Sequence, residues 1–456
     1  MNTAQRSSFH LRRKRAGLAR GTSVSRRGGA PWPLALLGAL AAARVAVLVL
    51  RPRDGLIRSD PVDVAAYFAA DDIARARRYG RPQLALQAGA SLVQAGVLVA
   101  FAARAAQLPG GSAERRAYLP ARGGRGRAAE FRKAQARPLV DAALLGVALS
   151  LAVGVAPLPL RAIARRRALS VGLATQTWEA WAQDLLKGGA LGLALNAGAA
   201  SVAVALMRRF PRGWWLPASG VAVAGAGALT FLAPVVLDPL FNSFTPLAEG
   251  QTRSDVLELA DRAGVSVGEV YEVDASRRTS AANAYVSGLG ATKRVVLFDT
   301  LLRELTREET RLVVAHELAH VRHRDVPRGL AHLALSAPAG MYAVAQLTRC
   351  LDRSGTQRAS AASLPALVLA LGLVSAAVGA IACGLSRTVE RRADAFSLTL
   401  ADAPEPFISF ERRIVTQNLA DPDPPRWLVG LMGTHPPTIE RIGIARAYAR
   451  GVRAGS

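Results

Sequence analysis

Two histidines and a glutamate close together give the most specific chemical signal in the sequence. His316, Glu317 and His320 form the pattern His-Glu-x-x-His. Residues four apart lie on one face of a helix, so the two imidazoles can bind one metal ion. Glu317 lies beside them, where its carboxylate can accept a proton from the water molecule that attacks a peptide bond. With six histidines in 456 residues a chance match is rare, and the spacing predicts a metallopeptidase centre on a helix over 307–322.

A catalytic zinc ion needs a third protein ligand, and the best candidate lies downstream. His323 is unsuitable because it lies about 10 Å along the helix axis from His316. Glu390 and Asp394 are four residues apart on a predicted helix and share a face. We therefore expect Glu390 to bind the metal, while Asp394 accepts a hydrogen bond from the far nitrogen of a ligand imidazole. The alternative is that Glu390 pairs with neighbouring arginines on a solvated face.

Long apolar segments surround these residues. The chain is 51% hydrophobic but only 5% aromatic, which favours closely packed membrane helices over an aromatic-rich soluble core. Its net charge of +25 comes mostly from arginines between apolar segments, which favours contact with anionic lipid over nucleic-acid binding. Seven segments have membrane-spanning length: 33–50, 83–106, 139–160, 188–207, 215–236, 329–348 and 362–384. We expect a mainly α, multi-pass membrane protein with a zinc peptidase domain, in the cell membrane if the host is bacterial.

The first apolar segment carries Arg44 near its middle. An arginine inside the membrane must face a cavity or a carboxylate, and Asp141 in the third segment is a candidate partner. Alternatively the segment is shifted, and the Arg44 side chain extends to the membrane surface. The sequence leaves both readings open.

The apolar segments divide the chain into five parts. These are a basic tail predicted to be disordered (1–31), the first five spans with their loops (32–236), a soluble insert with the HELAH helix (237–328), two further spans (329–384) and a C-terminal region (385–456). Because two spans separate the insert from the C-terminal region, both lie on one side of the membrane and can build one site. Within the insert we expect an amphipathic helix over 251–263 and short strands at 270–273 and 294–298.

The HELAH segment followed, two spans later, by Ser-Arg-x-x-Glu-x-x-Ala-Asp resembles the type I CAAX prenyl protease family of membrane zinc metallopeptidases. Further segments match the pattern of that family: 241–247, 283–285, 293–302 and His435-Pro436-Pro437 with Arg441. The resemblance covers residues 231–445, and upstream it extends only to the number of spans. The basic tail and the loop 107–137 are departures from the family pattern.

The resemblance implies a ring of seven helices around an aqueous chamber, with one zinc ion per chain facing it. It also implies that Asn283 and the strand after it bind the substrate backbone, and that His435 and Arg441 complete the site. His435 can donate a hydrogen bond to the oxyanion that forms when water attacks a peptide carbonyl. A histidine that caps a helix before a Pro-Pro turn is the alternative for His435.

We expect Asn283-Ala284-Tyr285 to lie on an exposed strand edge beside the zinc ion. A peptidase that cleaves varied sequences must bind what all peptides share, and an open strand edge offers hydrogen bonds to the backbone. The segment lies between Ser/Thr-rich and Gly-rich stretches and precedes the strand expected at 294–298, so a hairpin is plausible. The alternative is an ordinary hairpin with Tyr285 packed on the core of the insert.

Together these features predict a membrane-embedded zinc metalloendopeptidase. Its expected partners are the lipid bilayer and a peptide or protein substrate, with membrane-anchored or lipidated proteins as candidates. Three alternatives stay open: a heat-shock-type quality-control metalloprotease, which usually has fewer spans, a non-catalytic pseudoprotease that binds membrane proteins, and a polytopic transporter. The intact metal ligands and base argue against the pseudoprotease, and no broken midplane helices support a transporter.

Overall fold

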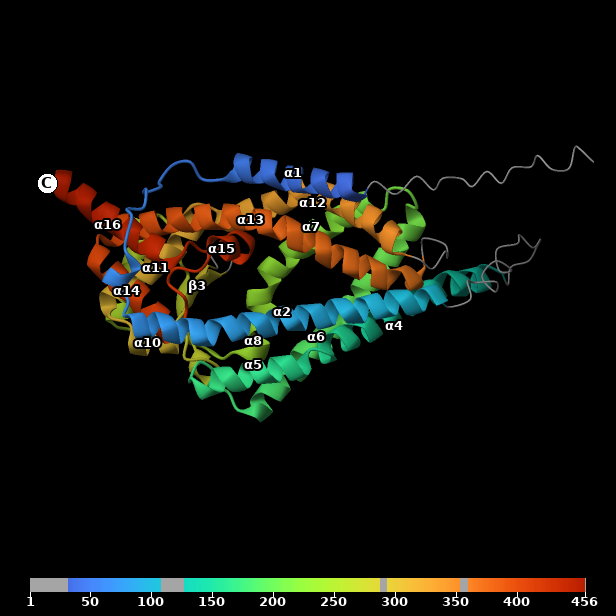
Figure 1. Cartoon of the computed structure of the whole chain (residues 1–456), viewed down its shortest axis with the longest axis horizontal. Coiled ribbons are helices and arrows are strands. Elements are labelled where there is room, and N and C mark those ends of the chain that lie inside the picture. Colours follow the sequence, from blue (N-terminus) through green and yellow to red (C-terminus); the bar gives the residue numbers. More distant parts are fainter. Residues whose placement is uncertain (1–31, 108–126, 288–292, 353–359, 456) are drawn as a thin grey trace, which may run out of the picture.

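Long helices dominate the computed structural model, which describes residues 32–107, 127–287, 293–352 and 360–455 (Figure 1). The predicted tail 1–31 and most of the loop 107–137 therefore lie outside the described residues. The long helices run side by side from the end of the molecule that holds the small sheet to the opposite end. They are α1 (Trp32–Leu50), α2 (Ala70–Gln107), α4 (Arg127–Val155), α6 (Trp178–Arg209), α7 (Trp215–Leu232), α12 (Asp325–Leu351) and α13 (Leu364–Ala401).

Six helical segments of the described chain are long and apolar enough to cross a membrane. They coincide with six of the seven predicted spans, and α7 continues through a π-helical turn, Ala233–Leu237, into α8 (Asp238–Phe241). The remaining predicted span, 329–348, lies in α12, which packs against α1, α7 and α13. Helix α12 buries polar side chains, including His332 and Gln346, and is not one of the six candidate segments. The mainly helical membrane fold is confirmed.

Close contact between small residues holds the membrane helices together. Helices α4 and α6 form the most extensive helix pair of the described chain. At their contact, a Cβ atom added to Gly146 would lie 2.7 Å from the Cβ of Ala200, so only glycine allows this approach. The Arg44 side chain on α1 is exposed, and within the described chain it has no hydrogen bond or ion pair with Asp141. The structure therefore gives no support to an Arg44–Asp141 pair.

A four-stranded sheet lies beside the ends of these helices, with the strand order β1-β2-β4-β3. The strands are β1 (Phe244–Pro246), β2 (Glu269–Val273), β3 (Ala284–Ser287) and β4 (Arg294–Phe298). Strands β2 and β4 are parallel, while β3 pairs antiparallel with β4 and forms one edge of the sheet. The strands expected at 270–273 and 294–298 are therefore present, and the segment after Asn283 forms an edge strand.

Apolar side chains fasten this sheet to the helix that carries the HELAH sequence. Helix α9 (Gln251–Arg262) and helix α11 (Arg307–Arg322) share one core with the sheet, and both coincide with the predicted helices to within one residue. Val295 on β4 and Leu318 on α11 are fully buried there. This core fixes the orientation of α11 relative to the sheet, and so the direction in which its histidines point.

Shorter helices complete the same end of the molecule. They are α5 (Leu158–Ser170), α10 (Asp299–Glu304), α14 (Pro404–Gln417), α15 (Arg426–Met432) and α16 (Thr438–Gly455). Helices α14 and α16 pack on each other, and both α11 and α13 contact this pair. The insert and the C-terminal region therefore meet at the HELAH helix.

Candidate active site

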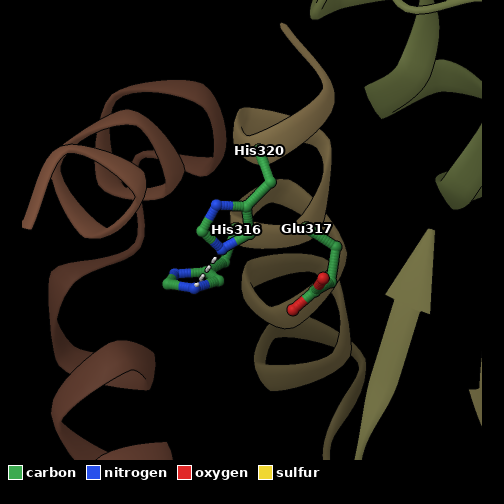
Figure 2. Close-up of side chains that lie close together, drawn as sticks. All are labelled: His316, Glu317 and His320. Atoms are coloured by element: carbon green, nitrogen blue, oxygen red, sulfur yellow. Dashed lines mark hydrogen bonds between the residues drawn. The ribbon is translucent and has the colours of Figure 1, made fainter. Parts of the chain in front are cut away.

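Helix α11 brings the two histidines together. It begins with a capping box, in which the Thr306 hydroxyl accepts from the Glu309 amide and the Glu309 carboxylate accepts from the Thr306 amide. Figure 2 shows His316 and His320 stacked edge to face on one side of the helix, with Glu317 projecting from the adjoining side. The Nε2 atoms of the two imidazoles are 3.2 Å apart. Potential ligand atoms of these three residues all lie within 4.8 Å of one another.

Helix α13 contributes Glu390 to the same point. Its Oε2 atom lies 3.2 Å from His316 Nε2, and its Oε1 atom lies 3.7 Å from His320 Nε2. Ligand atoms at tetrahedral positions about 2.0–2.1 Å from a zinc ion are about 3.3–3.4 Å apart, which is close to this spacing. Glu390 Oε2 is buried and has no hydrogen bond of acceptable geometry among the described residues. A buried carboxylate oxygen without a donor, facing two imidazole nitrogens, fits a metal site.

Each imidazole has a carboxylate on its other nitrogen. His316 Nδ1 lies 3.0 Å from Asp394 Oδ1, and His320 Nδ1 lies 3.1 Å from Asp325 Oδ2. A carboxylate at Nδ1 favours a proton there, which leaves the Nε2 lone pair free for a metal ion. The predicted placement of Asp394 beside a histidine is therefore present, although His316 Nδ1 makes no hydrogen bond of acceptable geometry within the described residues. The equivalent position of Asp325 was missed.

The sequence did not identify Asp325 as a partner of His320, because Asp325 lies beyond the end of α11. Arg324 adopts a left-handed backbone conformation with φ of 54°, and this turn directs the chain back toward His320 before α12 begins. Arg392 of α13 holds the carboxylate, with Nη2 2.5 Å from Asp325 Oδ1, and Arg328 also binds it. A carboxylate immediately after a helix end, with arginines on both sides, was the only signal in the sequence.

Arg441 of α16 anchors Asp394 from behind. Its Nε and Nη2 atoms donate to the two carboxylate oxygens of Asp394, at 2.9 and 2.5 Å. The third nitrogen of the guanidinium, Nη1, lies 2.5 Å from Oε1 of Glu411 on α14. Arg441 therefore acts on the site through Asp394 and does not reach the histidines directly.

Glu411 is a fully buried carboxyl group that the sequence analysis did not identify. Neither of its oxygens has a hydrogen bond of acceptable geometry in the described chain, even though Arg441 is close. Asp394 already takes two guanidinium donors, so burial dominates and raises the pKa of Glu411 to about 7. The side chain is a titratable group behind the histidines, in contact with Arg441.

Glu317 faces a cavity of about 170 Å³. Burial raises the pKa of its carboxyl group, which suits a residue that must both accept and donate a proton. Both polar and apolar side chains line the cavity. It is lined by Ala282, Asn283, Leu301, Leu312, Val313, His316, Glu317, Phe407, Phe410, Ile414, His435 and Arg441.

Of the predicted substrate-binding and oxyanion residues, Asn283 and His435 line this cavity, whereas Ala284 and Tyr285 do not. His435 Nε2 lies 3.2 Å from Glu390 Oε2, and Asn283 lines the cavity wall. The Oδ1 atom of Asn283 accepts a hydrogen bond from the amide of Ala284, whose own side chain is buried in the sheet. Tyr285 packs on the core of the sheet and directs its hydroxyl to within 3.4 Å of Asp238, outside the cavity.

His323, which the spacing excluded from the metal site, lies at the C-terminal end of α11. Its ring packs edge to face against Phe396, with the ring centroids 5.5 Å apart. It has no place among the donor atoms around Glu390.

Comparisons with known proteins agree with this geometry. The model of peptidase family M48 matches residues 246–449, and the model of the CAAX prenyl protease N-terminal region, with five membrane helices, matches residues 127–243. The chain is 35% identical over 300 residues to the uncharacterized metalloprotease YhfN of Bacillus subtilis, covering 64% of this chain and 70% of that protein. It is also 35% identical over 146 residues to CAAX prenyl protease 1 of Saccharomyces cerevisiae, covering 32% of each chain.

A solved structure shares the fold. The crystal structure of S. mikatae Ste24p superposes with a TM-score of 0.66 over 91% of this chain and 99% of that chain, at 20% sequence identity. The similarity therefore includes the membrane helices as well as the sheet and the HELAH helix.

Proposed function

Because the chain belongs to peptidase family M48, we propose that His316, His320 and Glu390 bind one zinc ion and that Glu317 is the general base. The protein is a multi-pass membrane metallopeptidase that acts on peptides or proteins, as the sequence predicted. The donor spacing around Glu390 supports the choice of zinc, since three protein ligands and one open position are typical of a catalytic zinc site.

One observation carries the proposal. Donor atoms of three residues from two helices converge, with separations of 3.2, 3.2 and 3.7 Å, while the outer nitrogens of both imidazoles face carboxylates. Neither arrangement is expected if Glu390 lies on a solvated helix face. The alternative reading, in which Glu390 pairs with arginines, has no support in the described contacts, because Arg387 and Arg391 bind other groups.

Residues of the chain carry out proton transfer, oxyanion stabilisation and substrate binding. A bound zinc ion would polarise the substrate carbonyl and lower the pKa of a water molecule. Glu317 accepts the proton from the attacking water and then donates it to the leaving amine, a role that its raised pKa favours. His435 donates a hydrogen bond to the developing oxyanion. Asn283 binds the substrate backbone at the cavity wall, next to the free edge of β3.

The substrate we propose is a peptide segment of a protein held at the membrane. Glu390 lies on α13, a helix that also forms a candidate membrane span, so the catalytic residues lie at the end of a membrane helix. Relatives named CAAX prenyl proteases support lipidated proteins as one substrate class. No contact among the described residues requires a prenyl group, and a membrane anchor of another kind satisfies the same geometry.

The substitution Glu317→Gln tests the proposal. The purified variant, in lipid nanodiscs, should retain one zinc ion per chain and lose peptidase activity by about 10²- to 10⁴-fold on quenched fluorescent peptides. Glu308→Gln is the matched control, because it makes the same change at an exposed position of the same helix. Near-normal turnover by the Glu317 variant would refute the assigned base. Zinc binding by an inactive wild-type protein would favour the pseudoprotease alternative.

A further inference from the structure

His435, unlike the proposed base Glu317, lies on no helix or strand. It belongs to the link 433–437 between α15 and α16, and its side chain is 60% exposed. Helix α15 has only seven residues and buries none of them. A segment this short and this exposed needs an external contact to keep His435 in place beside Glu390.

Arg387 of α13 provides that contact. Its Nη1 atom donates to the carbonyl oxygen of Val429 at 2.7 Å and to that of Gly433 at 2.6 Å. The first carbonyl belongs to the last turn of α15 and the second to the residue that follows it. The Val429 carbonyl also accepts from the Gly433 amide at 3.0 Å, and the guanidinium adds a short, charge-assisted bond to each of the two carbonyls. Arg387 therefore ties both ends of the last turn of α15 to α13.

The same helix carries the residue that His435 must face. Arg387 precedes Glu390 by three residues, so both side chains lie on one side of α13, about one turn apart. The Nε2 atom of His435 lies 3.2 Å from Oε2 of Glu390. One helix face thus holds the link and presents the carboxylate, which sets the distance between them.

Gly433 supplies a second, independent sign that the link is closely fitted. A Cβ atom added at this position would lie 2.8 Å from the carbonyl oxygen of Val429, the atom that Arg387 binds. A side chain at 433 would therefore push this carbonyl aside. The tight turn and the arginine contact require the same placement of the backbone, two residues before His435.

We propose that Arg387 is a positioning residue, which holds His435 at its catalytic distance by binding the backbone of the α15–α16 link. The inference rests on the proposed function, in which His435 stabilises the oxyanion. Arg387 touches neither substrate nor metal in this arrangement. Its loss should lower kcat more than it raises KM, because only the transition state uses the hydrogen bond from His435.

A double-mutant cycle tests the proposal with the full-length protein in nanodiscs and quenched fluorescent peptides. Arg387→Ala should lower kcat/KM by about tenfold or more with zinc content unchanged, and Arg387→Lys should restore part of the loss, because an ammonium group still offers donors. In a His435→Ala background, Arg387→Ala should have no further effect. Arg412→Ala is the matched control, since it removes an arginine that donates to a backbone carbonyl, that of Tyr67, away from the site.

Several outcomes would overturn the inference. Wild-type kcat/KM in the Arg387→Ala enzyme would do so, and so would fully additive losses in the double variant. If Arg387→Ala does not fold, Gly433→Ala carries the test, and it must show the same dependence on His435. Full activity of His435→Ala alone would instead refute the catalytic role of His435, a separate failure that belongs to the proposed function.

Discussion

Buried side chains are dense around α11 and sparse along the membrane-spanning helices. The HELAH helix packs Leu312, Val314 and Leu318 into cores shared with the sheet and with α14 and α16. In the span Trp215–Phe241, by contrast, no residue of the most apolar stretch is buried by the protein itself, and in the other spans the share reaches at most 28%. The catalytic end is therefore stabilised by contacts within the chain, whereas the spans depend on lipid and on a few close helix pairs.

The two regions also differ in the side chains that make their closest contacts, which are charged at the site and small among the spans. Around the site, Asp394 and Glu411 are fully buried and share one arginine, an arrangement that is costly to break. Among the spans, contacts between small residues such as Gly146 and Ala200 bring backbones close. A substitution at the catalytic end should therefore act through charge and metal binding, and one among the spans through packing alone.

The largest expected effect distinguishes Glu390 from His323. Glu390→Ala should lower zinc affinity by more than about 100-fold, because it removes a proposed ligand and not only a supporting group. His323→Ala should leave zinc content unchanged, since its ring packs on Phe396 away from the donor atoms. Metal per protein, measured by mass spectrometry on purified variants, decides between them. Equal zinc loss in both variants would mean that the third ligand is misassigned.

The next effect concerns Glu411 and stability against pH. Its pKa is about 7 in the folded protein and about 4.3 when unfolded, so the unfolded state loses this proton first as pH rises. The contribution of protonated Glu411 to the free energy of unfolding is fully present below about pH 4. About 3 kcal/mol of this stability is lost as the pH rises to 7. Glu411→Gln should abolish that decline in thermal unfolding scans, whereas Glu308→Gln should keep it. Parallel pH curves for wild type and Glu411→Gln would exclude this titration.

Asn283 offers a smaller effect at the cavity wall. Asn283→Ala should lower kcat/KM by about tenfold, or about 1.4 kcal/mol, with zinc content unchanged. Asn196→Ala is the control from the membrane region, where that amide donates to the Ser150 hydroxyl at 3.0 Å. Steady-state kinetics on the same peptides compare the two. If the Asn283 variant cleaves peptides at the wild-type rate, the edge strand is not part of the substrate-binding surface.

The smallest effect belongs to the membrane helices. Gly146→Ala places a methyl group against Ala200 and should cost about 1 kcal/mol of stability, with zinc content unchanged. Gly188→Ala on α6 is the matched control, because no atom lies within 4 Å of the added carbon. Thermal unfolding in nanodiscs measures both. A loss of zinc in the Gly146 variant would show that the two regions are more tightly coupled than their packing indicates.

Local patterns in the sequence were sufficient for much of the fold. The capping box at Thr306 and Glu309 marks the start of α11, and helical spacing alone places His316 and His320 on one face. Glu390 and Asp394 follow from the same periodicity together with the number of intervening spans. Each of these inferences uses residues within one turn of a helix or a count of apolar segments.

Contacts that depend on a change of chain direction were beyond such reasoning. Asp325 reaches His320 only because Arg324 reverses the chain, and no residue type requires that turn. Glu411 lies on an amphipathic helix whose packing partner, α16, cannot be known from spacing. Arg387 binds backbone carbonyls, which every residue has, so no pattern of side chains identifies its partners.

The unbroken length of α13 joins the catalytic end to a candidate membrane span. This helix has 38 residues, and at 1.5 Å per residue it extends about 57 Å, nearly twice the thickness of a hydrocarbon core. Glu390 lies about 39 Å from its first residue, so a change of helix tilt of 10° would displace the carboxylate by about 7 Å. The histidine helix packs on α13, and Arg441 and Arg387 fasten further parts to it, so these elements move together. A change of tilt would therefore carry these residues together, mostly parallel to the membrane plane, while the contacts among them are preserved.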